Sequence, residues 1–241
     1  MAYQKTQGIV LARTDYREND RMITLLSPDF GLVDALCRGC RKPKSPLITA
    51  GELFCMGEYM LYSSAARETV TGCTVIEAFY PLRLNYPRLS YAAMMLHICL
   101  KVAQPGEPAS HLYILLARSL KRLAYEETPA DQVSCAFLMH LASIAGFRPR
   151  LNHCVRCGKA MGEAENAFLI PQEGGVCCSV CGSRLPLRQM LPAASLAWLR
   201  AILTRGIDKV KSAPPDIPYQ PMADFVACHL DSKLPEVAKE E

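Results

Sequence analysis

Short runs with β-branched residues, or with alternating apolar and polar residues, fill the first third of the chain and predict β-strands. The pattern recurs five times, and the sequence SPDFG at residues 27–31 supplies a turn between the second and third runs. The runs are residues 7–14, 21–27, 32–38, 54–63 and 69–79. Because short strands expose their edges unless the sheet closes on itself, residues 1–80 are expected to form a small closed barrel.

Beyond residue 80 the spacing of apolar residues becomes that of helices. Three helical segments, separated by proline-containing stretches, are expected at residues 88–104, 110–126 and 130–146. Two further helices are expected near residues 193–205 and 222–232. The sequence thus predicts an α+β multidomain protein, with the barrel at 1–80, a helical domain at 81–150 and 186–241, and an insert at 151–185.

The insert is rich in cysteine and glycine and carries two C-x-x-C pairs. With no apolar leader and no apolar run of membrane-spanning length, the chain's 12 cysteines are expected to stay reduced, so clustered ones favour metal binding. Two knuckles with this spacing predict one structural Zn²⁺ held by Cys154, Cys157, Cys178 and Cys181. Cys177 is an alternative to Cys178, and simple reduced thiols are the alternative to a metal site.

A basic segment follows the third predicted strand. Residues 35–51 contain no acidic residue but hold four cations, Arg38, Arg41, Lys42 and Lys44. A basic loop on the rim of a barrel favours nucleic-acid binding over a merely solvated loop. Arg13 and Arg21 are further candidates, although acidic residues interleave with them and surface ion pairs are equally consistent. The isolated pair Cys37 and Cys40 is expected to be two ordinary thiols.

The net charge of +4 arises in residues 81–153, which hold eight basic and four acidic residues. Within them Arg118, Lys121 and Arg122 share one face of a predicted helix. This face is either the solvated side of an amphipathic helix or a docking surface for phosphate or an acidic peptide. The chain has no phosphate-binding glycine loop, nucleophile elbow or H-E-x-x-H motif, so the residues favour a binding module over an enzyme.

Several segments, taken together and in order, resemble the RecO family of bacterial recombination mediators. They are GIVLARTDYRENDRMITLLSPDFGLVDALCRGCRKPKSP near the start, VIEAFYPLR at 75–83, GFRPRLNHCVRCG at 146–158, GGVCCSVCG at 174–182 and ACHLDSKLP at 227–235. The resemblance covers nearly the whole chain. It implies an N-terminal OB-fold barrel, a helical domain and a zinc-binding insert with the four cysteines named above.

The resemblance also implies a function. A member of this family binds single- and double-stranded DNA, anneals complementary strands and, with RecR, helps load RecA onto strands coated by the single-stranded-DNA-binding protein. The DNA-contacting loop would contain the four cations of residues 38–44, and the location would be cytoplasmic, at the nucleoid. The main alternative is a zinc-ribbon scaffold that binds other proteins and does not contact DNA.

Overall fold

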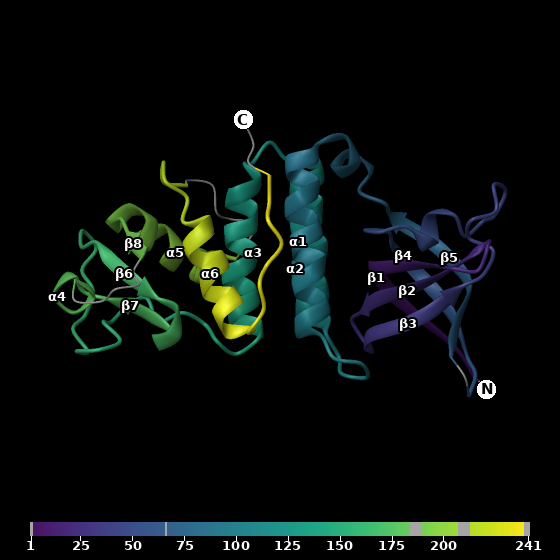
Figure 1. Cartoon of the computed structure of the whole chain (residues 1–241), viewed down its shortest axis with the longest axis horizontal. Helices are drawn as coiled ribbons and strands as arrows, with labels where there is room; N and C mark the ends of the chain where they lie inside the picture. The colour runs from purple at the N-terminus through teal and green to yellow at the C-terminus, as the bar shows by residue number, and fades with distance from the viewer. Residues whose placement is uncertain (1, 66, 184–188, 207–212, 239–241) are drawn as a thin grey trace. The chain divides into compact units, whose positions relative to one another are not determined.

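The computed structural model describes residues 2–65, 67–183, 189–206 and 213–238. Figure 1 shows the order of the elements along the chain. The chain divides into two compact units, Met1–Tyr125 and Glu126–Glu241. The border between them falls inside the helical domain that the sequence suggests, and the domain bounds expected from the sequence stay a prediction.

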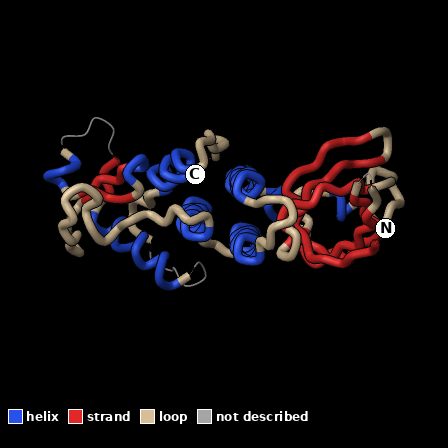
Figure 2. Tube along the Cα trace, turned by 90° about the horizontal axis from the view of Figure 1, so that it is seen from below, coloured by secondary structure: helices blue, strands red, loops and turns tan. Residues whose placement is uncertain are grey.

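The first unit begins with a closed five-stranded barrel, as expected. Its strands are β1 (Ala2–Tyr16), β2 (Asp20–Ser27), β3 (Gly31–Cys37), β4 (Met56–Ser63) and β5 (Glu68–Glu77). Around the barrel the order is β1-β2-β3-β5-β4, with β3 and β5 parallel and the other pairs antiparallel, which is the strand arrangement of an OB-fold. The strands curl into a ring in Figure 2.

Strand β1 has 15 residues and pairs with both β4 and β2, and it is irregular where the two pairings meet. Its register with β2 shifts between Val10 and Ala12, and there Val10 exchanges backbone hydrogen bonds with Phe54 and Cys55 instead. Apolar residues that alternate along the strands fill the barrel, together with the buried thiols of Cys37 and Cys40. The expectation that these two cysteines are ordinary thiols agrees with this burial.

Two helices complete the first unit. The helix α1 (Tyr86–Val102) follows a short 3-10 turn, η2 (Tyr80–Leu84), and α2 (Ser110–Tyr125) runs beside it (Figure 2). The connection between α1 and α2 lies against the turn between β2 and β3. Its backbone bonds there are Leu32 N–H to Gln104 O at 3.2 Å, Gly106 N–H to Phe30 O at 2.9 Å and Ala109 N–H to Pro28 O at 2.9 Å.

The second unit joins three helices to a small sheet. Helix α3 (Ala130–Ile144) packs against α5 (Ala193–Arg205) and α6 (Tyr219–His229). The sheet has the order β7-β6-β8, and its strands are β6 (Ala167–Ile170), β7 (Gly175–Cys177) and β8 (Gln189–Leu191). The 3-10 turn η3 (Pro171–Glu173) lies between β6 and β7, and the one-turn helix α4 (Ser179–Gly182) follows β7. Among the described residues, none of the helices combines the length and apolarity that a membrane crossing requires.

Candidate functional site

The two C-x-x-C pairs of the insert meet in space. The Sγ atoms of Cys154, Cys157, Cys178 and Cys181 all lie within 4.8 Å of one another. The Sγ atoms of Cys157 and Cys178 are 3.9 Å apart. Four sulfurs placed tetrahedrally about 2.3 Å from a zinc ion are separated by roughly 3.8 Å. The four thiols therefore form a set that could hold one metal ion.

Local backbone hydrogen bonds fold each pair into a knuckle. In the first, Cys154 N–H donates to Lys159 O at 2.8 Å and Gly158 N–H to Cys154 O at 2.9 Å, and Gly158 has a φ of +75°. In the second, α4 follows Cys178, and Gly182 packs on the ring of Phe168, whose Cγ would lie 2.8 Å from an added Cβ. Gly158 thus serves the turn, whereas Gly182 serves close packing.

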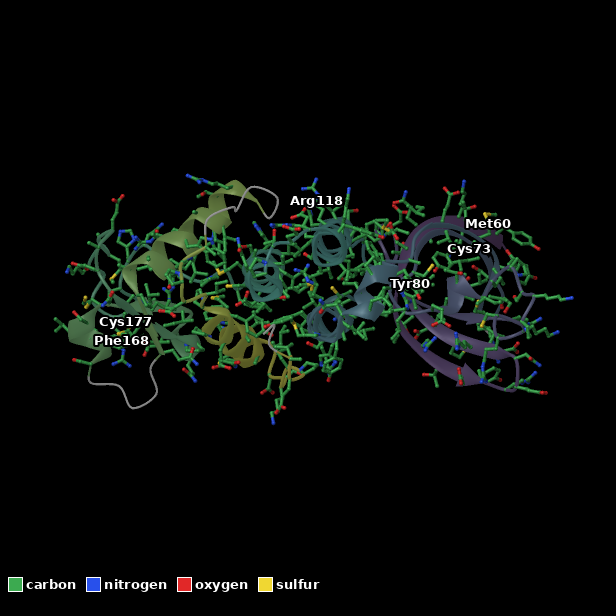
Figure 3. All side chains as sticks on the ribbon, turned by 90° about the horizontal axis from the view of Figure 1, so that it is seen from above. Met60, Cys73, Tyr80, Arg118, Phe168 and Cys177 are labelled. Atoms are coloured by element: carbon green, nitrogen blue, oxygen red, sulfur yellow. The ribbon has the colours of Figure 1, made fainter. Side chains whose placement is uncertain are left out.

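The geometry distinguishes Cys178 from Cys177. Cys177 is buried in β7, opposite Phe168 in the sheet register, and Figure 3 labels both residues; it is not one of the four thiols whose Sγ atoms all lie within 4.8 Å of one another. Burial alone would raise the pKa of the Cys154 thiol, but the backbone N–H groups of Cys157, Cys178 and Arg156 outweigh it and lower that pKa to about 6. Cys154 therefore favours the thiolate, the form that binds metals, whereas hydrogen bonds with the neighbouring thiols raise the pKa of Cys181 to about 12.

Two cations of the insert, Arg156 and Lys159, pair with carboxylates of the insert. The Arg156 guanidinium Nε donates to both oxygens of Glu173, at 2.9 and 3.0 Å, and this contact lowers the pKa of Glu173. Lys159 Nζ lies 2.8 Å from Glu165 Oε1. These pairs tie the first knuckle to its surroundings, and they neutralise the charge of both cations.

The basic loop starts where β3 ends and is held to the turn between β1 and β2. Gly39 N–H donates to Asp20 Oδ1 at 2.8 Å, Arg41 N–H donates to Asn19 O at 3.0 Å, and Cys40 is 1% exposed in the barrel core. All four predicted cations of this loop, Arg38, Arg41, Lys42 and Lys44, are exposed. A fixed backbone thus presents four long basic side chains to solvent.

The candidate barrel cations fall into two groups. Arg13 pairs with Glu52, and Arg21 pairs with both Glu52 and Asp15, its side chain being only 14% exposed. The loop's Arg41 also reaches Asp15, at 3.3 Å. Within the described ranges, Arg38, Lys42 and Lys44 have no carboxylate partner. The uncompensated positive charge of the loop therefore belongs to these last three residues.

Two further arginines, which the sequence does not single out as binding residues, lie on Tyr16 at the end of β1. The Cζ atoms of Arg17 and Arg67 are 5.3 and 5.6 Å from the centre of its ring, and the Arg67 guanidinium lowers the pKa of the phenol. Arg17 also lines a hollow of about 460 Å³ with Arg38 and Lys42, and the carboxylates of Glu18 and Asp20 line it too. Only closure of the barrel brings these arginines together, so no local sequence signal marks them.

The three cations expected on one exposed face of α2 separate in the structure. Arg118 and Lys121 are exposed, and Figure 3 labels Arg118 on this helix. Arg122 is only 6% exposed, because it lies on the helix side that also carries the buried residues Ser119 and Leu123. The expectation of three accessible cations is therefore wrong for Arg122.

Comparison with known proteins identifies the family. Residues 1–79 match the family model described as "Recombination protein O N terminal", and residues 83–235 match "Recombination protein O C terminal". The chain belongs to the RecO family. Relatives named "DNA repair protein RecO" include one from Acetivibrio thermocellus, 35% identical over 75% of this chain and 71% of its own, and one from Alkaliphilus metalliredigens, 32% identical over 94% of both.

RecO membership supports a role in DNA repair and recombination, as the resemblance in the sequence implied. A third relative, from Bacillus pumilus, carries the same name and is 31% identical over 81% of this chain and 75% of its own. The barrel with its cationic loop and the four-thiol cluster are the two candidate functional sites of this chain.

Proposed function

We propose that this chain is a recombination mediator that binds single- and double-stranded DNA, anneals complementary strands and, with RecR, helps load RecA onto coated single strands. The observation that carries the proposal is the group of exposed loop cations, Arg38, Lys42 and Lys44, which have no carboxylate partner within the described ranges. Membership of a DNA repair family supports DNA as the polyanion that they meet.

Annealing requires that phosphates be held while the pairing edges of the bases stay free. Lysine and arginine contacts to the backbone meet this requirement because they carry no sequence information. Neutralising phosphates on two strands also lowers the repulsion between them. Binding is therefore expected to tolerate any sequence and to weaken steeply as salt is added.

One Zn²⁺ is the metal that the thiol cluster fits, bound by Cys154, Cys157, Cys178 and Cys181. Bound zinc supplies a cross-link between the two knuckles. Four sulfur ligands leave no position for water or substrate, so the role proposed for the site is structural and the proposal assigns the chain no catalysed reaction.

Partner docking is proposed for the exposed cations of α2. Arg118 and Lys121 would receive the acidic tail of the single-stranded-DNA-binding protein, whereas Arg122 is too buried to take part. Mediation of this kind would place the protein with DNA at the cytoplasmic nucleoid.

A salt titration of DNA binding tests the proposal. The variant Arg38→Ala, Lys42→Ala, Lys44→Ala removes the loop cations that lack a carboxylate partner. Each phosphate contact to single-stranded DNA contributes about 0.7 to the slope of log K against log salt, so three lost contacts should flatten that slope by about 2. Fluorescence anisotropy with a labelled oligothymidylate measures it.

A matched control removes three cations that already have partners. Lys5 pairs with Glu58 at 2.7 Å, and Arg13 and Lys159 each pair with a glutamate. Replacing Lys5, Arg13 and Lys159 by alanine should leave the salt slope close to that of the parent chain. A loop variant with an unchanged slope would exclude the loop, and a parent chain that ignores oligonucleotides in dilute buffer would favour the scaffold alternative. Annealing of complementary oligonucleotides, with and without the coating protein, tests the proposed annealing activity and the proposed action on coated strands.

A further inference from the structure

A cavity of about 690 Å³ lies beside the first cysteine knuckle. One wall is formed by residues 148–155 and Gly158, and the other by Arg200, Leu203 and Thr204 of α5. All of these residues belong to the second unit. The volume is in the range of small-molecule sites and is sufficient for one nucleotide.

The walls combine positive charge with apolar surface. The positively charged lining residues are Arg148, Arg150 and Arg200, and no described lining residue is an aspartate or a glutamate. The apolar part of the lining consists of Pro149, Leu151, Val155 and Leu203. Such a cavity suits a ligand that carries an anionic group on a less polar body.

Arg200 builds the wall of the cavity. Its guanidinium donates to Leu151 O from Nη2 at 2.7 Å and from Nε at 3.1 Å, and to Met161 O at 3.2 Å. These bonds join α5 to the chain on both sides of the first knuckle. Arg200 therefore fixes the shape of the cavity, and much of its donor capacity is already used.

Arg148 and Arg150 have guanidinium N–H groups that could donate to a ligand in the cavity. Arg150 Nη2 donates to Glu173 O at 2.6 Å, which orients the guanidinium and leaves its other N–H groups. Arg148 is exposed and has neither an ion pair nor a side-chain hydrogen bond within the described ranges. Arg156 and Lys159, by contrast, are neutralised by Glu173 and Glu165. The uncompensated charge near the knuckle is thus concentrated at this cavity.

We infer that the cavity binds a phosphate group of a DNA strand, with Arg148 as the principal contact and Arg150 as the second. The inference rests on the proposed function, since it takes DNA as the ligand of this chain. Planar guanidinium groups match phosphate oxygens in pairs, which a lysine cannot do. A phosphate site here gives the second unit its own grip on DNA, in addition to the barrel loop.

DNA is favoured over an acidic peptide as the occupant. The chain belongs to a family of DNA repair proteins, and annealing requires two strands to be held at once. A cavity of this size can take the phosphate and sugar of one nucleotide, the phosphate at the arginines and the sugar against the apolar wall, which leaves the base free to pair. An acidic peptide remains an outcome that the experiment can detect.

The test uses the whole metal-loaded chain of 241 residues and the substitution Arg148→Ala. Binding of labelled oligothymidylate is measured in the parent chain and in the barrel-loop variant Arg38→Ala, Lys42→Ala, Lys44→Ala. In both backgrounds the affinity should fall about tenfold, because a charge-assisted contact is lost. The salt slope should also fall by about 0.7.

Arg205→Ala is the matched control. Arg205 is an exposed arginine at the end of α5 that does not line the cavity. Its removal should change neither the affinity nor the salt slope. Because no hydrogen bond of the described chain depends on the Arg148 side chain, Arg148→Ala should leave the far-ultraviolet circular dichroism and the metal content unchanged.

Three results would overturn the inference. If Arg148→Ala binds as tightly as the parent while the barrel-loop variant weakens, the cavity is not a DNA site, although the proposed function stands. If neither variant weakens binding, both proposals fail. If Arg148→Ala loses affinity for an oligoglutamate peptide but keeps its affinity for oligothymidylate, the cavity serves an acidic protein segment instead.

Discussion

The contact between the β2–β3 turn and the α1–α2 connection predicts that Gly31→Ala is strongly destabilising. Gly31 has a φ of +65°, a conformation that costs alanine about 1 kcal/mol. An added Cβ would also collide with the carbonyl oxygen of Gln104 and lie 2.5 Å from that of Glu107. The backbone of the connection would therefore have to move away from the turn.

The movement gives the magnitude. It would break the backbone bonds from Leu32 to Gln104 and from Gly106 to Phe30, each with a net value of about 1 kcal/mol. Together with the strain, the free energy of unfolding of the first unit should fall by about 3 kcal/mol. For a unit of this length, that corresponds to a decrease in Tm of about 10 °C.

Urea denaturation followed by circular dichroism measures the loss. Gly106→Ala is the control, because Gly106 has a φ of +78° but no atom within 4 Å of an added Cβ, so only the strain of about 1 kcal/mol applies. If Gly31→Ala were no more destabilising than Gly106→Ala, the packing argument would be refuted.

Three further predictions concern the insert and the end of the barrel. Cys154→Ser with Cys178→Ser should abolish metal binding, measured by elemental analysis, and speed amide exchange in β6 and β7. Burial opposes ionisation of Glu77, but the two backbone N–H groups that follow it lower its pKa, so it stabilises the fold above its ordinary pKa of 4.5. That contribution is lost as pH falls through the folded-state pKa, and Glu77→Gln should flatten the loss of stability in acid denaturation. Gly182→Ala should force the Phe168 ring aside and weaken metal binding roughly tenfold in a chelator competition.

Each of these predictions has a control or a contrary outcome. Cys228→Ser alters an exposed thiol outside the cluster and should retain the metal. A stability difference that is the same at every pH would show that Glu77 acts by packing and not by charge. Gly162→Ala introduces a Cβ at an ordinary 3.4 Å contact and should leave metal affinity intact.

The barrel and the thiol cluster could be predicted because each depends on a local pattern. Strands β1 to β5 have seven or more residues each and carry β-branched or alternating residues, which is long enough to show a strand pattern. The spacing of Cys154 to Cys157 and of Cys178 to Cys181 sets two sulfurs of each knuckle on one side of the chain. The choice between Cys177 and Cys178 depends on the register of β7, which two consecutive cysteines in a sequence do not reveal.

The features that escaped prediction depend on tertiary contacts. Strands β6, β7 and β8 have three or four residues each, too few to show alternation. The burial of Arg122 follows from what packs on α2, because helical spacing places side chains on one side without deciding whether that side meets solvent. The same holds for Arg21 and Glu52, which are 31 positions apart and meet only after the barrel closes.

The two family matches change over between residues 79 and 83, yet the compact unit that starts with the barrel continues to Tyr125. The turn at residues 28–32 relies on backbone partners at residues 104–109, beyond the point where the barrel's own sequence family ends. The barrel thus matches a family model of its own, but its turn is completed by residues outside that match. A barrel exchanged between relatives should fold stably only if α1 and α2 are exchanged with it. A barrel excised near residue 80 would lack the backbone hydrogen-bond partners of its β2–β3 turn.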